Sequence, residues 1–118
     1  MRKGGGLNIQ KMLKEAESSE NQEVYFSIDK NRNCRIGVIA RSTRSKSPRF
    51  FIEVIVCLFP NYGKVDLQSL KREIAFLEEL HKRNYSLTCQ DGNYISCEME
   101  VSINNLAEEY RAIKMLKA

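Results

Sequence analysis

The sequence lacks the segments that would take a chain into or through a membrane. Its longest uninterrupted apolar run, Val54 to Phe59, is far too short to span a bilayer. The N-terminal stretch MRKGGGLNIQ contains no continuous apolar region of the kind found in signal peptides. We therefore expect a cytoplasmic protein with no membrane partner.

The residues from which catalytic and metal sites are most often built are scarce or poorly spaced. His81 is the only histidine, and it falls in a basic segment at the predicted end of a helix. No C-x-x-C pair, Gly-x-Ser-x-Gly motif or phosphate-binding glycine loop is present. We therefore predict that the protein is not an enzyme and needs no metal or cofactor. We expect small, buried, reduced thiols at the four cysteines, Cys34, Cys57, Cys89 and Cys97.

Acidic residues are missing from one long segment. The chain has 19 basic and 15 acidic residues, yet Lys30 to Ile52 contains seven basic residues and no acidic one. Guanidinium groups suit phosphate oxygens, so this segment is a candidate site for an anion or a nucleic acid. The alternative is a solvated hairpin tip whose positive charges deter edge pairing. The candidate contacts are Arg32, Arg35, Arg41, Arg44, Lys46 and Arg49.

The remaining composition is that of one soluble globular domain. Of the 118 residues, 42% are hydrophobic and 29% are charged, and no repeat or Pro/Gly-rich linker divides them. We expect a flexible leader over residues 1–7 and a single domain over residues 8–118.

Hydrophobic periodicity predicts a helix and three strands in the first half of the chain. The third strand is apolar almost throughout, which predicts a central strand covered on both faces. The predicted bounds are Asn8–Glu17 for the helix and Val24–Asp29, Cys34–Ala40 and Arg49–Phe59 for the strands.

The segment after Asp66 has the clearest helical pattern. Asp66 offers a side-chain oxygen to the first free amides of this helix. One apolar stripe should face the core, and charged residues should cover the other side. The stripe consists of Leu67, Leu70, Ile74, Leu77 and Leu80, and the predicted charged side includes Lys71, Arg72, Glu73 and Glu78.

A hairpin and a last helix complete the chain. We favour a three-residue loop, 90–92, with Gly92 in the left-handed conformation. This loop pairs Leu87 with Ile95, and it pairs Tyr85 with Cys97, so apolar residues oppose apolar residues. The last helix should begin near Asn104.

The predicted order is α-β-β-β-α-β-β-α. Short connections favour antiparallel neighbours, and amphipathic helices need a sheet face to pack on. This predicts an α+β two-layer sandwich with a five-stranded, largely antiparallel sheet and helices on one face. The order, and the segment LEELHKRNYSLTCQDGNYISCEMEV (Leu77 to Val101) most of all, resembles the bacterial type III secretion chaperone-like group.

The resemblance implies a protein- or peptide-binding role, usually as a dimer. Apolar surface beyond what one sheet-helix interface can hide also favours a homodimer. The leading hypothesis is a non-enzymatic binding module that holds a protein or peptide partner in a chaperone-like or assembly role. One alternative is an RNA- or DNA-binding protein that uses the basic loop, residues 41–49. A second is a small enzyme whose site no motif reveals.

Overall fold

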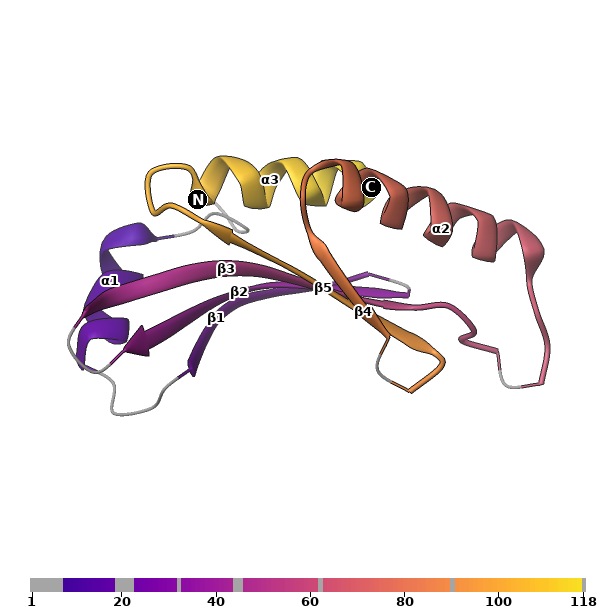
Figure 1. The fold of residues 1–118 in the computed structure, drawn as a ribbon, viewed down its shortest axis with the longest axis horizontal. Coiled ribbons are helices and arrows are strands. Elements are labelled where there is room, and N and C mark those ends of the chain that lie inside the picture. The colour runs from indigo at the N-terminus through magenta and orange to yellow at the C-terminus, as the bar shows by residue number, and fades with distance from the viewer. Residues whose placement is uncertain are drawn as a thin grey trace, which may run out of the picture.

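The computed structural model describes residues 8–18, 23–31, 33–43, 46–61, 63–89 and 91–117. Its elements follow the predicted order of one helix, three strands, a helix, two strands and a last helix (Figure 1). The predicted leader, residues 1–7, lies outside the described residues. The bounds are α1 Ile9–Ser18, β1 Glu23–Asn31, β2 Cys34–Thr43, β3 Lys46–Cys57, α2 Leu67–Lys82, β4 Ser86–Cys89, β5 Tyr94–Val101 and α3 Leu106–Lys117.

The five strands form one antiparallel sheet in the order β1-β2-β3-β5-β4. β3 lies at its centre, as its apolar sequence predicts. The expected coverage of β3 on both faces is wrong, however. Ile52 and Val54 are fully buried, whereas the alternate residues Phe51, Glu53 and Ile55 are only half-buried. One face of the sheet therefore carries the core, and the other remains partly accessible.

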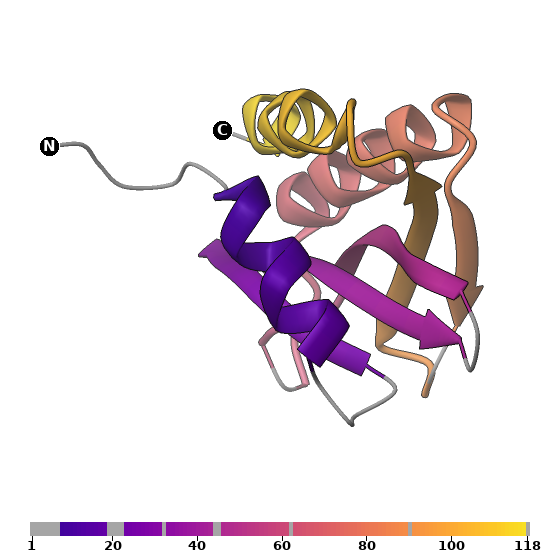
Figure 2. The same cartoon turned by 90° about the vertical axis from the view of Figure 1, so that its left-hand side faces the viewer.

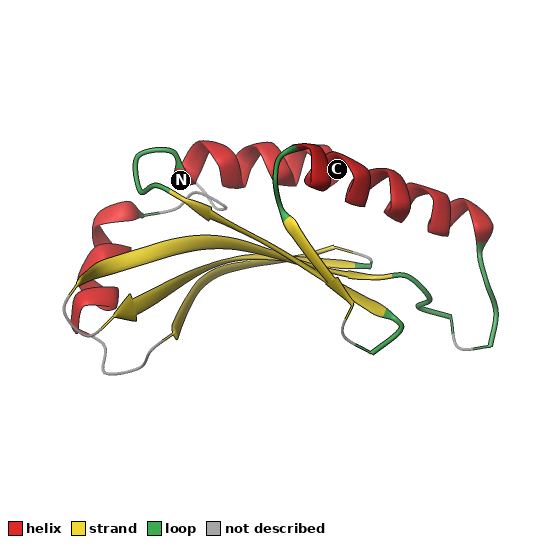
Figure 3. Ribbon diagram, in the orientation of Figure 1, coloured by secondary structure: helices red, strands yellow, loops and turns green. Residues whose placement is uncertain are grey.

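All three helices cover the same face of the sheet, which confirms the two-layer α+β sandwich (Figure 2, Figure 3). α1 packs against β1, β2 and β3, and α3 packs against β2 and β3. The core forms where alternate strand residues meet the apolar sides of these helices. It includes Met12 and Ala16 of α1, Phe76, Leu77 and Leu80 of α2, and Leu106, Tyr110 and Ile113 of α3.

α2 and α3 lie side by side and run in opposite directions. Arg83, just after α2, pairs with Glu109 in the first turn of α3, with 2.8 Å between Nη2 and Oε1. Lys117, at the end of α3, pairs with Glu73 in the middle of α2. The first turns of α2 therefore extend past the end of α3 (Figure 1).

The hairpin of β4 and β5 has the predicted faces but not the predicted register. Leu87 pairs with Cys97, and Cys89 pairs with Ile95, so the expected pairing is wrong by two residues. A shift of two keeps each side chain on the same face, because strand side chains alternate with a period of two. Gly92 has a φ of 85°, which confirms the left-handed turn.

Candidate functional site

Arg41 and Arg49, two of the predicted anion contacts, lie opposite each other in β2 and β3 rather than in the loop between them. Both project from the helix-free face, because the neighbouring residues Ala40 and Phe50 are buried under the helices. The fold thus brings this part of the predicted cluster together. Like charges placed directly opposite on paired strands repel each other, so the pair needs compensation.

Carboxylates supply that compensation for Arg41. Its Nε lies 2.8 Å from Oε2 of Glu23 on β1. Its Nη1 and Nη2 donate to both oxygens of Glu98 on β5, at 2.9 Å and 2.6 Å. All three nitrogens of the guanidinium group donate to these carboxylates. Its central carbon, Cζ, lies 4.5 Å from the centre of the Phe51 ring.

Arg49 is neutralised in the same way. Its Nε donates to Oε2 of Glu100 at 2.8 Å, and a second nitrogen reaches the other carboxylate oxygen. The guanidinium lies 5.7 Å from the centre of the same Phe51 ring. Two arginines and three carboxylates from β1, β2, β3 and β5 therefore form one cluster across the helix-free face of the sheet.

The pKa shifts agree with this geometry. Hydrogen bonds from Arg41 to Glu98 and Glu23 raise the pKa of its guanidinium despite partial burial. The hydrogen bond from Arg49 lowers the pKa of Glu100. Burial raises the pKa of Glu53, and the nearby charge of Glu98 raises it further. A phosphate arriving here would have to displace carboxylates that already hold both arginines.

The other candidate contacts do not join this cluster within the described residues. Arg32 and Arg44 lie outside them, and so does the side chain of Lys46, although its backbone is part of β3. Arg35 is exposed on the helix-free face, but it lies six residues before Arg41 on the same strand. At the rise of an extended strand this separation is roughly 20 Å.

Sequence reasoning missed the carboxylates of this cluster. Glu23, Glu98 and Glu100 all lie on strands outside the basic segment, on β1 and β5. A signal was present in the stretch SCEMEV. Its glutamates recur with a period of two, which places both on one face of a strand.

A second surface is formed by the exposed side of α2. The predicted core stripe is wrong in part: Leu77 and Leu80 are buried, but Leu67 is 63% exposed and Ile74 is 45% exposed. With Lys71 and Glu78, which are also exposed, they form a row at helical spacing along the outside of the helix. We call Leu67, Lys71, Ile74 and Glu78 the α2 row.

A buried polar network explains the orientation of α2. Glu73, expected to face solvent, is only 3% exposed and pairs with Lys117. Nδ2 of Asn33, in the turn between β1 and β2, donates to Oγ of Ser69 at 3.0 Å and to Oε2 of Glu73 at 3.3 Å. A helix that turns Ser69 and Glu73 inward must turn the α2 row outward.

The cysteines and the histidine are dispersed. Cys34 and Cys97 are buried, Cys57 is half-buried and Cys89 is exposed, and all four are free, so the expected burial is correct for two of them. His81 is exposed in the last turn of α2. Within the described part of the chain, no three His, Cys, Asp or Glu residues are grouped so that they could hold a metal ion.

No protein-family model matches this chain, and no characterised protein or solved structure is similar enough to it to count as a relative. Among the described residues, no helix has both the length and the apolar character needed to cross a bilayer.

Proposed function

We propose that the protein is a non-enzymatic binding module that dimerises through α2 and holds a segment of a protein partner on the open face of its sheet. The observation that carries the proposal is the α2 row, in which Leu67 and Ile74 face solvent on an otherwise well-packed helix. Water-exposed Leu and Ile side chains are stabilised when a second surface covers them. A second copy of the same helix is the simplest such surface.

The charges of the α2 row suit an antiparallel arrangement of two copies. A two-fold axis near Ile74 and Ala75 places Lys71 of each copy opposite Glu78 of the other. The same axis brings the two Ile74 side chains together at the centre. This arrangement therefore covers Ile74 of both copies and pairs opposite charges twice. It also places Leu67 of each copy opposite the exposed Lys82 of the other, whose aliphatic stem can cover it in part.

Dimerisation through α2 leaves the helix-free face of each sheet available for a partner. This face presents Tyr25, which is 51% exposed, together with Ile55 and Tyr94 among charged residues. Tyrosine suits contact surfaces because it buries a large ring while its hydroxyl keeps a polar contact. The element order of the secretion chaperone-like group supports the same role, a dimer that holds a polypeptide segment.

The nucleic-acid alternative receives less support from the same geometry. Arg41 and Arg49 are bound to carboxylates, so they would contribute to phosphate contacts only after those ion pairs break. Counterion release, which drives such binding, requires cations that are available to phosphates.

Sedimentation equilibrium over a concentration series tests the dimer with charge-reversal variants of the α2 row. We expect Lys71→Glu to weaken self-association about tenfold or more, because two carboxylates would then face each other across the interface. The double change Lys71→Glu with Glu78→Lys should restore it. Lys14→Glu, on the exposed side of α1, is the matched control and should have no effect. A strictly monomeric wild-type protein, or a dimer indifferent to Ile74→Lys, would contradict the proposal.

Partner binding is tested separately with a permanently unfolded, carboxymethylated protein as the probe. Fluorescence anisotropy should show saturable binding to the wild type and weaker binding to Tyr25→Lys, which places a charge on the open face. Lys14→Glu again serves as the control. Equal binding by the Tyr25 variant and the wild type would contradict the proposal that the partner binds to the helix-free face of the sheet.

A further inference from the structure

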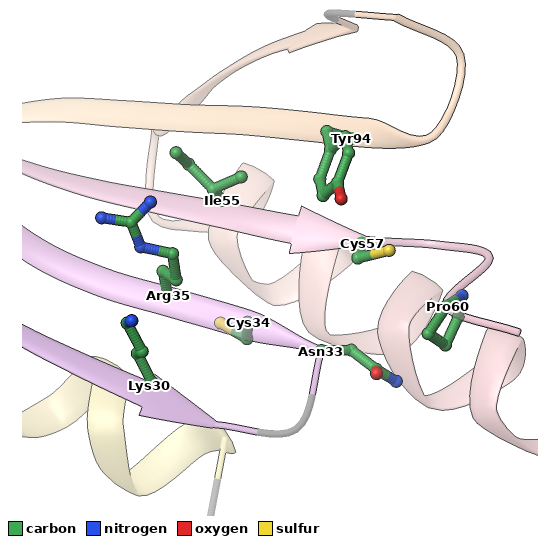
Figure 4. A pocket seen from close by; sticks show the side chains of 8 residues that line it. All are labelled: Lys30, Asn33, Cys34, Arg35, Ile55, Cys57, Pro60 and Tyr94. Carbon is green, nitrogen blue, oxygen red and sulfur yellow. The ribbon is translucent and has the colours of Figure 1, made fainter.

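A cavity of about 310 Å³ opens at the end of the sheet opposite the basic loop (Figure 4). It lies where the turn between β1 and β2 meets the end of β3 and the start of β5. The residues that line it include Lys30, Arg35, Ile55, Cys57, Pro60 and Tyr94. This site is separate from the α2 row, but it shares Ile55 and Tyr94 with the helix-free face proposed above for a protein partner. Its volume is at the lower end of the range, roughly 300–1,000 Å³, that small-molecule sites occupy.

The positive charges beside this cavity are arranged in an unfavourable way. Lys30 and Arg35 are register partners on neighbouring strands, so their side chains stand next to each other on one face. Like charges in that position repel each other. Among the described residues, none of those lining the cavity is acidic, and neither Lys30 nor Arg35 forms an ion pair.

The same sheet provides an internal comparison. Arg41 and Arg49 form another directly opposed cationic pair, and the fold surrounds it with three carboxylates. The charge of Arg35 interacts with that of Glu53, which lies on β3 diagonally across from Arg35 and two residues before Ile55. Arg35 lowers the pKa of Glu53, but burial and Glu98 act more strongly in the opposite direction. Lys30 and Arg35 thus lack the direct ion pairs that Arg41 and Arg49 have.

The remaining walls suit an apolar group. Ile55 lies directly opposite Arg35 in the sheet, and Tyr94 is the register partner of Cys57. Pro60 closes the end of the cavity (Figure 4).

Hydrogen bonds hold the end of β3 against the start of β5. The side chain of Asn93 accepts from the Phe59 amide at 2.8 Å and donates to the Phe59 carbonyl at 3.3 Å. The Cys57 thiol also donates to Asn93 at 3.5 Å. The wall beside Pro60 is therefore preformed, and a ligand would lose little binding energy to ordering it.

We propose that this cavity binds a small organic anion. A carboxylate or phosphate group would lie between Lys30 and Arg35, and an aromatic or aliphatic body would rest against Ile55, Tyr94 and Pro60. The anion supplies the direct ion pair that Lys30 and Arg35 do not form within the described residues.

Isothermal titration calorimetry at fixed ionic strength tests the site with phenyl phosphate and benzoate as the two anionic probes. Inorganic phosphate and acetate supply the charged halves of these two probes alone, and phenol supplies the apolar half. We expect at least one of the two complete probes to bind more tightly than either half, and the tighter one identifies the preferred anion. Arg35→Gln should weaken that binding about tenfold or more, because it removes a charge-assisted hydrogen bond. Arg111→Gln, an exposed arginine on α3, is the matched control.

Thermal unfolding supplies a readout that also monitors folding. Lys30→Gln and Arg35→Gln should each leave the free protein at least as stable as the wild type, because each relieves the repulsion. The tighter probe should raise the Tm of the wild type but not that of either variant. The proposal is overturned if neither phenyl phosphate nor benzoate binds saturably to the wild type. An equal loss of affinity in Arg111→Gln, or an unchanged rise in Tm in Arg35→Gln, would also overturn it.

Discussion

Lys117→Met is the change that we expect to destabilise the fold most through electrostatics. The wild-type ammonium group pairs with Glu73, and the exposed fractions of the two side chains are 11% and 4%. Methionine keeps most of the aliphatic length of Lys117, so the packing loss is small. It also removes the ammonium nitrogen that lies 5.0 Å from the centre of the Phe76 ring. The carboxylate of Glu73 would remain buried, with Asn33 as its remaining hydrogen-bond donor at 3.3 Å.

The magnitude follows from the burial of the pair. Removing one partner of a buried ion pair costs about 3–5 kcal/mol, and the retained Asn33 contact places the expected cost near the lower end, at about 3 kcal/mol. Replacing both partners, with Glu73→Leu added to Lys117→Met, should return the free energy of unfolding to within about 1 kcal/mol of the wild type. Asn33 keeps its bond to Ser69 in that double variant.

Urea unfolding followed by circular dichroism at neutral pH measures these free energies. Lys82→Met is the control, because Lys82 and Glu79 form an exposed pair on α2 with side-chain exposures of 71% and 47%. The control should cost less than about 1 kcal/mol. A similarly small cost for Lys117→Met, or a double variant as unstable as the sum of its single changes, would refute the account of the buried network.

Three further predictions concern pH, helix capping and thiol reactivity. A hydrogen bond from Arg83 lowers the pKa of Glu109 below its usual value of 4.5. The Glu109 carboxylate therefore contributes stability above about pH 4.5, and this contribution is lost as the pH falls through the lower pKa of the folded state. In urea titrations, Glu109→Gln should lose less stability than the wild type between neutral pH and that acidic range. Asp66→Ala should lower the free energy of unfolding by about 1 kcal/mol in the same assay, because two amides at the start of α2 lose their acceptor. A disulfide-exchange reagent should label Cys89 in the folded protein but Cys34 and Cys97 only on unfolding, since burial raises the pKa of both buried thiols to about 12.

The element order and fold class followed from the sequence because they depend on periodicity and short connections. The central position of β3 followed from its apolar sequence, and the cap at Asp66 from local chemistry. The register of the last hairpin could not be predicted from the sequence, because a shift of two residues keeps the same side chains facing the core.

The candidate sites were harder to predict because they depend on pairings between distant segments. Nothing local to Arg41 indicates that Glu98 will lie beside it, since β5 reaches β3 only after α2 and β4. The inward turn of Glu73 depends on Lys117 and Asn33, which are far away along the chain. Helical periodicity treats a charged residue as solvent-facing and cannot anticipate a buried partner.

The place of β5 in the sheet has a consequence for how the chain folds. β1, β2 and β3 pair in sequence order and can form a meander early, but the second edge of β3 waits for β5. Pairing Cys57 with Tyr94 closes a loop that contains the whole of α2 and β4. Until that loop closes, the most apolar strand of the protein presents an unpaired edge, which is a template for intermolecular pairing. Aggregation during refolding should therefore rise with protein concentration, and changes that delay the docking of β5 should increase it.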